Sequence, residues 1–232
     1  MLNVISVRNH HLLADGLDEE SIVLDLGAHK GEFSGWIAKT FGSTCHAIEA
    51  VPALYAAIPP APKVHLYNFA ISANNGPLQM YLSDNPEANS ILVDASHSAR
   101  QTQVVEGITL GTLISRLELQ RIDLLKADIE GAEIALFDST PDDVLRKIRQ
   151  ISVEFHDFIP ELKIEEDVRR IKRRLRALGF YCIEWSRTNA DVLFINRRSF
   201  PASLLDYLLL KFVLRYVFGF GRALKRLLAD SR

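Results

Sequence analysis

Four side chains capable of acid–base chemistry follow two consecutive apolar segments of the chain. Asp128 and Glu130 come directly after the first segment, and Glu154 and His156 end the second. Because the carboxyl ends of parallel strands meet at one edge of a sheet, where ligands bind, we expect these side chains to form a site. Each alone has a structural explanation, such as a helix cap, a solvated carboxylate or a hydrogen-bonded histidine, but the coincidence of four favours catalysis.

His156 is the first candidate for a general base, because the ordinary histidine pKa of ~6.5 suits proton removal near neutral pH. Asp128 is the second candidate. Glu130 and Glu154 would orient the base or bind a divalent cation, since clusters of carboxylate oxygens suit Mg²⁺. The sequence assigns no residue as a metal ligand, and it leaves metal dependence open.

A glycine-containing segment, residues 25–31, reads Asp-Leu-Gly-Ala-His-Lys-Gly between an apolar strand pattern and a helical pattern. Glycine lets a ligand approach the main chain, and a helix N-terminus offers free N–H groups. The spacing differs from the Gly-x-Gly-x-x-Gly of dinucleotide sites. A carboxylate just before the first glycine suits a ligand with an ammonium group, which S-adenosylmethionine has. Many sheet proteins, however, use such a turn only for close packing.

Glu49 ends the next apolar segment, residues 44–48. In sheets that bind nucleosides, a carboxylate ~20 residues beyond the glycines accepts hydrogen bonds from the ribose hydroxyls. We therefore assign Glu49 to a ribose, with a solvated strand end as the alternative.

Strands and helices that alternate along the chain must position these residues. The apolar patterns predict main-sheet strands over residues 22–26, 44–48, 64–71, 122–127, 148–155, 180–186 and 192–196. Helices are expected over residues 33–41, 51–58, 110–117 and 164–178. The predicted fold is α/β, a doubly wound, mainly parallel seven-stranded sheet that ends in an antiparallel hairpin.

Three other segments carry expectations of their own. Residues 1–20 show weak periodicity and are expected to hold at most a short helix. Residues 78–82 alternate as the returning strand of a hairpin with residues 64–71, and residues 84–100 are polar and aperiodic, as in a long functional loop.

The composition is that of an ordinary globular protein. The 232 residues are 48% hydrophobic and carry a formal charge of −2, which gives no drive toward nucleic acid. Two cysteines, Cys45 and Cys182, cannot build a disulfide framework, which suits the cytoplasm. We expect neither a signal peptide nor a standard transmembrane helix, and we divide the chain into a domain over residues 1–200 and a tail over residues 201–232.

The chain resembles the FkbM-type family of S-adenosylmethionine-dependent methyltransferases. The motifs that carry the resemblance are residues 25–31, 47–49, 70–72 followed by Gly76, 89–92, 109–110, 154–156 and, most specifically, Leu-Lys-Ala-Asp-Ile-Glu-Gly-Ala-Glu at 125–133. Three positions depart from the family pattern, in which Asn, Pro and Asp usually stand where this chain has His29, Ala50 and Gly111.

The resemblance implies a Rossmann-like methyltransferase fold and an O-methyltransferase for a hydroxyl of a carbohydrate, lipid-linked glycan or secondary metabolite. Asp25 and Gly27 would bind the methionine end of S-adenosylmethionine, Glu49 the ribose, and Ala70 and Ile71 the adenine. The full set of expected cofactor-binding residues is Asp25, Gly27, Ala28, Gly31, Glu49, Ala70, Ile71 and Asp128.

The tail over residues 201–232 is the most apolar part of the chain. On a helical wheel its basic residues, among them Lys211, Arg215, Arg222 and Arg226, share a narrow face opposite leucines and aromatics. This pattern is typical of a helix that lies in a membrane interface with anionic lipids, here the inner face of the membrane. The alternative is a helix that packs on the domain or on a second subunit.

Two other functional classes remain open at this point. The first is an NAD-dependent oxidoreductase on a similar sheet, which the glycine spacing and the closing hairpin disfavour. The second is a non-catalytic protein that binds the cofactor and uses its tail to tether an assembly.

Overall fold

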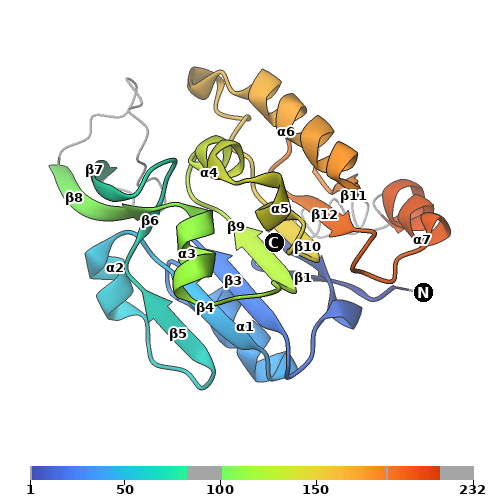
Figure 1. Ribbon diagram of the computed structural model, residues 1–232, viewed down its shortest axis with the longest axis horizontal. Coiled ribbons are helices and arrows are strands. Elements are labelled where there is room, and N and C mark those ends of the chain that lie inside the picture. Colours follow the sequence, from blue (N-terminus) through green and yellow to red (C-terminus); the bar gives the residue numbers. More distant parts are fainter. Residues whose placement is uncertain (1, 83–100, 187, 215–232) are drawn as a thin grey trace, which may run out of the picture.

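A seven-stranded sheet organises the computed structural model, which describes residues 2–82, 101–186 and 188–214 (Figure 1). The strand order is β11-β12-β10-β9-β3-β4-β5. The bounds are β3 Ile22–Leu26, β4 Thr44–Ile48, β5 Val64–Tyr67, β9 Leu124–Ala127, β10 Gln150–Val153, β11 Phe180–Glu184 and β12 Val192–Asn196. Neighbouring strands are parallel except at β12, which is antiparallel to both β10 and β11. The predicted fold class and closing hairpin are thus confirmed.

Helices cover both faces of this sheet. One face is covered by α3 Leu110–Arg116, α4 Glu133–Ser139, α5 Asp142–Leu145 and α6 Glu165–Leu178, whose apolar residues share one core with alternate strand residues such as Leu24 and Leu125. The opposite face packs against α1 Glu32–Phe41 through the other alternate residues, among them Val23 and Leu124. The period-two alternation of each strand therefore divides the core into two layers.

Local sequence signals fix the ends of these helices. Gly42 ends α1 with φ 71° and Gly179 ends α6 with φ 103°, left-handed conformations that glycine adopts without steric cost. The Thr109 hydroxyl caps α3 by accepting a hydrogen bond of 3.2 Å from the Thr112 amide. These three ends coincide with the bounds predicted for the helices over residues 33–41, 110–117 and 164–178.

The first residues form an antiparallel hairpin rather than a predominantly irregular segment. Strands β1 Val4–Val7 and β2 His10–Leu13 are joined by Arg8 and Asn9, whose φ angles of 48° and 66° are those of a tight two-residue hairpin turn. A single 3₁₀ turn, η1 Ala14–Gly16, follows, so the expected short helix is present. The His11 ring stacks on Trp185 and its Nδ1 contacts the Asp191 carboxylate, which fixes the hairpin against β12.

A second, three-stranded sheet replaces part of the predicted third strand. Residues 64–71 form β5 in the main sheet and the separate β6 Ala70–Ile71. The predicted hairpin of residues 64–71 with 78–82 is wrong, because β7 Gly76–Leu82 pairs with β8 Gln101–Ile108, and β6 pairs with β8 in parallel. Short helix α2 Pro52–Ala57 lies between β4 and β5, and Val51 and Leu54 pack against this second sheet. The loop expected over residues 84–100, including the motif at 89–92, lies outside the described residues.

The described part of the tail packs on the main sheet. Helix α7 Leu204–Leu209 continues into a π-helical turn, η4 Leu210–Leu214, and Tyr207 stacks on Tyr181 of β11 with ring centroids 4.3 Å apart. Leu210 is buried in a cluster with Ile183 and Phe200. Among the described residues, no helix combines the length and apolar character needed to cross a bilayer. The remaining tail, residues 215–232, lies outside the described residues.

Candidate functional site

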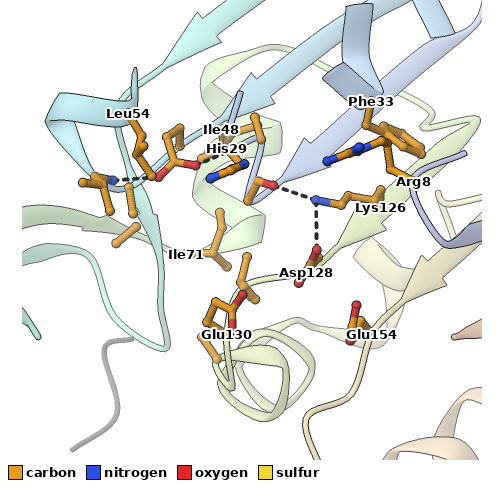
Figure 2. Close-up of a pocket in the computed structure, with 18 of the residues that line it drawn as sticks. Arg8, His29, Phe33, Ile48, Leu54, Ile71, Lys126, Asp128, Glu130 and Glu154 are labelled. Atoms are coloured by element: carbon orange, nitrogen blue, oxygen red, sulfur yellow. Dashed lines mark hydrogen bonds and ion pairs between the residues drawn. The ribbon is translucent and has the colours of Figure 1, made fainter. Parts of the chain in front are cut away.

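A cavity of about 610 Å³ lies beyond the carboxyl ends of β3, β4, β9 and β10. It lies where β3 has β4 on one side and β9 on the other, the topological switch point at which open α/β sheets bind ligands. Of the expected site residues, the cavity is lined by Gly27, Ala28, Glu49, Ala70, Ile71, Asp128, Glu130, Glu154 and His156. Figure 2 shows the acidic side chains at one end of this cavity and Ile48, His29 and Leu54 toward the other.

The glycine turn after β3 is held against two neighbouring strands. The amides of Gly27 and Ala28 both donate to the Ile48 carbonyl of β4, at 3.0 and 2.9 Å. Gly27 has a φ of 80°, and a Cβ there would lie 1.8 Å from the main-chain oxygen of Asp128. Only glycine therefore lets β3 and β9 end so close together, and the turn exposes main chain to the cavity.

Asp25 and Gly31 occupy supporting positions behind this turn, outside the cavity lining. The Asp25 carboxylate is fully buried, accepts a hydrogen bond of 2.7 Å from the Ser34 hydroxyl, and lies 3.2 Å from Lys126 Nζ. Gly31 begins α1 with φ 71°, and a Cβ there would contact Ile58. The sequence predicts that Asp25 and Gly31 contact the cofactor directly. Their positions outside the cavity lining do not favour such a contact.

Lys126 connects Asp25 to the cavity. Its buried ammonium donates to the Gly27 carbonyl at 2.6 Å and lies 3.8 Å from Asp128 Oδ2 (Figure 2). Burial opposes the charged form, but the carboxylates of Asp25 and Asp128 outweigh it and raise the pKa of Lys126. The charged form of Lys126 is therefore favoured, and its ammonium group stabilises the glycine turn through the Gly27 carbonyl.

Glu49 lies at the carboxyl end of β4, as predicted. Its two carboxylate oxygens accept hydrogen bonds from the amides of His29 at 2.7 Å and Val51 at 2.9 Å (Figure 2). Burial raises the pKa of Glu49 despite these two bonds. His29 itself has a φ of 51°, a left-handed conformation in which Asn and His are enriched, which accounts physically for the substitution at this position.

The four acid–base candidates meet at the other end of the cavity. His156 Nε2 lies 3.3 Å from a Glu130 oxygen and 3.9 Å from Asp128 Oδ1. Burial favours the neutral form of Asp128, but Lys126, His10 and His156 together outweigh it and hold the pKa of Asp128 well below its ordinary value. The prediction that two strand ends bring these residues together agrees with the structure.

His156 does not have the surroundings of a free general base. Its Nδ1 lies 3.2 Å from the buried Glu133 carboxylate, so both ring nitrogens face carboxylates. Burial opposes protonation, but Glu130 and Glu133 outweigh it and raise the pKa of His156 to about 11. An imidazolium carries a proton on each ring nitrogen and so has no lone pair for a substrate proton. These surroundings do not favour His156 as the base, and the choice of His156 from the sequence stays a prediction.

Glu154 presents a carboxylate to the cavity from the end of β10. Burial, and then the negative charge of Asp128, raise the pKa of Glu154 to about 7. The pKa of Glu154 is therefore raised and that of Asp128 lowered, although both side chains line the same cavity.

His10 and Lys126 are site residues that the sequence reasoning missed. His10 is buried at the end of the N-terminal hairpin, with Nε2 3.7 Å from Asp128 Oδ2. The β-branched residues Val4, Ile5 and Val7 before Arg8-Asn9 are a strand signal followed by a possible turn, and they were the available signal for this hairpin. Lys126 belongs to the motif at 125–133, but its role depends on a contact with Asp25 on the neighbouring strand β3.

Comparisons with solved structures find chains of low identity. A precorrin-6y C5,15-methyltransferase from Geobacter metallireducens is 13% identical, with 77% of this chain and 80% of that chain covered and a TM-score of 0.39. A fibrillarin pre-rRNA processing protein from Methanococcus jannaschii is 10% identical over 84% and 81%, with a TM-score of 0.40. A putative methyltransferase from an antibiotic biosynthesis pathway of Anabaena variabilis is 15% identical over 75% and 63%, with a TM-score of 0.33.

No curated protein matches the chain in a sequence comparison. A family model does match, over residues 25–182, which include the glycine turn, Glu49 and the acidic cluster. Its description is methyltransferase FkbM domain. Because this match spans more than half of the sequence, the chain belongs to the FkbM-domain methyltransferase family.

Proposed function

We propose that the protein transfers a methyl group from S-adenosylmethionine to a hydroxyl of a carbohydrate, a lipid-linked glycan or a related secondary metabolite. One observation carries this proposal: a single cavity joins the glycine turn and Glu49 to a cluster of carboxylates at the ends of β9 and β10. The first part suits a nucleoside with an amino-acid chain, and the second suits an acceptor hydroxyl that must lose a proton.

The cofactor-binding roles follow from what each residue offers to the cavity. Glu49 would accept hydrogen bonds from the ribose hydroxyls, and Ala70 and Ile71 would contact the adenine through apolar surface. The main chain at Gly27 and Ala28 would lie along the methionine end. Asp25, which lies outside the cavity lining, would act indirectly by positioning Lys126 beneath the turn.

The acidic end would hold the acceptor. A bound S-adenosylmethionine would supply an activated methyl group for the acceptor oxygen and would leave as S-adenosylhomocysteine. The carboxylates of Glu130 and Glu154 would take up the hydroxyl proton. The protein contributes by holding the oxygen in line with the methyl group and by removing its proton.

Phe158 supports a carbohydrate as the acceptor. Phe158 is 42% exposed and lines the cavity, and its ring lies 5.5 Å from the His156 ring between centroids. An exposed aromatic face beside carboxylates offers both an apolar surface for the C–H face of a sugar and acceptors for its hydroxyls.

The cofactor assignment is tested by isothermal titration with S-adenosylhomocysteine. Glu49→Ala should weaken binding about 10- to 100-fold, because hydrogen bonds to a buried carboxylate are lost. Glu19→Ala, at an exposed position away from the cavity, should bind as the wild type does. Unchanged affinity in a well-folded Glu49→Ala protein would remove Glu49 from the cofactor site.

We also propose that residues 201–232 form a tail distinct from the domain over residues 1–200 and rest on a membrane surface. In its described part, Leu204, Leu205, Leu208, Leu209 and Phe212 are exposed. At 100° per residue these side chains share one side of the helix, opposite Tyr207 and Leu210, which pack on the sheet. An exposed apolar face followed by a sequence rich in arginine suits the interface of an anionic bilayer. We therefore propose a cytoplasmic protein at the inner face of the membrane.

The double variant Leu205→Glu/Leu209→Glu tests this surface. Wild-type protein should co-sediment with phosphatidylcholine vesicles that contain phosphatidylserine, less so at high salt, and the double variant should remain largely in the supernatant. Val104→Glu places a charge at an exposed apolar site on β8 and should not change co-sedimentation. If wild-type protein ignores the vesicles and the double variant converts a dimer to a monomer, this face is a subunit contact instead.

A further inference from the structure

The N-terminal hairpin brings an imidazole to the acidic end of the cavity. His10 is 1% exposed, and among the described residues no hydrogen-bond partner reaches its Nε2. This atom lies 3.7 Å from Asp128 Oδ2, beyond hydrogen-bond distance. A buried polar atom without a partner costs free energy, so its position beside two carboxylates requires an explanation.

The other ring nitrogen of His10 is fixed by a second contact. Nδ1 lies 3.1 Å from the Ser152 hydroxyl on β10. When Ser152 accepts a hydrogen bond from Nδ1–H, the neutral ring carries its lone pair on Nε2, directed at the carboxylates. Histidines that bind metal ions are held in this way, by an outer partner on the nitrogen that does not bind the metal.

The donor atoms lie close enough together to share one ion. One ligand atom each from His10, Asp128 and Glu154 lie within 4.8 Å of one another. Two donors on one ion, with bonds of ~2.1 Å, are about 3 to 4.2 Å apart. A small movement of the three side chains toward one another would therefore bring their donor atoms within bonding distance of one ion.

The local charge also favours a cation. The carboxylates of Asp25, Asp128, Glu130, Glu133 and Glu154 gather around one lysine, Lys126, and two imidazoles. Lys126 lies closer to Asp25 and to the Gly27 carbonyl, at 3.2 and 2.6 Å, than to Asp128 Oδ2, at 3.8 Å, so it offsets only part of this negative charge. Asp128, Glu130 and His156 form a second possible set of donors. In that set both ring nitrogens of His156 lie within 3.3 Å of a carboxylate, of Glu130 and of Glu133, whereas Nε2 of His10 has no described carboxylate oxygen closer than Asp128 Oδ2 at 3.7 Å.

We propose that His10, Asp128 and Glu154 bind one divalent transition-metal ion of the Mn²⁺ and Zn²⁺ class at the acceptor end of the cavity. One imidazole nitrogen with two carboxylate oxygens suits these ions better than Ca²⁺, which prefers oxygen ligands alone. The position beside the cavity would let the ion hold the acceptor oxygen and lower its pKa. That catalytic role rests on the proposed function, whereas metal binding by the three side chains does not.

Mn²⁺ is the probe for this site. Full-length protein freed of metal with EDTA should bind one Mn²⁺ per chain in isothermal titration, with Ca²⁺ binding much more weakly. Pulsed electron paramagnetic resonance should detect coupling of the bound Mn²⁺ to an imidazole nitrogen. His10→Gln should abolish this coupling and weaken Mn²⁺ binding by at least about 10- to 100-fold, whereas His65→Gln, at an exposed position on β5, should change neither.

Binding of S-adenosylhomocysteine, measured on the same samples, shows whether His10→Gln is folded and separates this proposal from the proposed function. Ser152→Ala provides a second, milder variant, with intermediate Mn²⁺ affinity expected. Absence of specific Mn²⁺ binding by the wild type would overturn the proposal. So would nitrogen coupling that survives in His10→Gln and disappears in His156→Gln.

Discussion

Replacement of Glu154 by glutamine should lower the rate of methyl transfer about 10²- to 10⁴-fold, the range expected when a group that handles a substrate proton is removed. Glutamine keeps the size of the side chain but cannot take up the proton or supply the negative charge beside the acceptor. Incorporation of label from methyl-labelled S-adenosylmethionine into a carbohydrate extract would measure the rate. Affinity for S-adenosylhomocysteine should remain close to that of the wild type, because Glu154 lies at the acceptor end of the cavity.

Two further variants define what this result means. Glu161→Gln changes an exposed carboxylate in the short 3₁₀ turn η3 Pro160–Leu162 and should keep full activity. His156→Gln should reduce the rate less than Glu154→Gln does, because His156 holds Glu130 and Glu133 rather than the substrate proton. Full activity of Glu154→Gln, together with a collapse in His156→Gln, would restore the sequence-based choice of His156 as base.

Replacement of Lys126 by methionine should destabilise the protein by about 3–5 kcal/mol, the cost of leaving a buried charge without its partner. Asp25 is fully buried, and Lys126 is the cation beside it at 3.2 Å. The same substitution removes the hydrogen bond to the Gly27 carbonyl, so affinity for S-adenosylhomocysteine should also fall. Denaturant unfolding gives the free energy, and titration gives the affinity.

The double variant Lys126→Met/Asp25→Asn tests the cause of this destabilisation. It removes both charges, so it should be more stable than Lys126→Met alone. Arg169→Met, which removes an exposed ion pair with Glu166, should change the stability by less than ~1 kcal/mol. If the double variant were no more stable than the single one, the loss would come from packing rather than from the uncompensated Asp25 charge.

The strands and helices that carry the site could be predicted because their signals are local. Residues 22–26 and 44–48 alternate or run apolar to their ends, Gly42 and Gly179 stop their helices, and the observed bounds of β3 and β4 match the prediction. The meeting of Asp128 with Glu154 could also be anticipated, because β9 and β10 are parallel neighbours whose carboxyl ends share one edge.

Features that depend on contacts between distant segments could not be predicted in the same way. Asp25 was expected to contact a ligand, but Lys126 from β9 occupies its carboxylate across the sheet. His156 was ranked by its ordinary pKa, whereas Glu133 and Glu130 enclose it after folding. The split of residues 64–71 into two strands depends on pairing with β8, which follows much later in the chain.

Binding of S-adenosylhomocysteine to the wild-type protein tests the central claim most directly. The affinity for S-adenosylhomocysteine and for NAD⁺ should be measured by isothermal titration on the same folded sample. The account predicts one S-adenosylhomocysteine bound per chain and no binding of NAD⁺. The glycine turn and Glu49 suit one nucleoside with an amino-acid chain, and the glycine spacing is not that of a pyrophosphate site. A folded protein that binds NAD⁺ and ignores S-adenosylhomocysteine would contradict it.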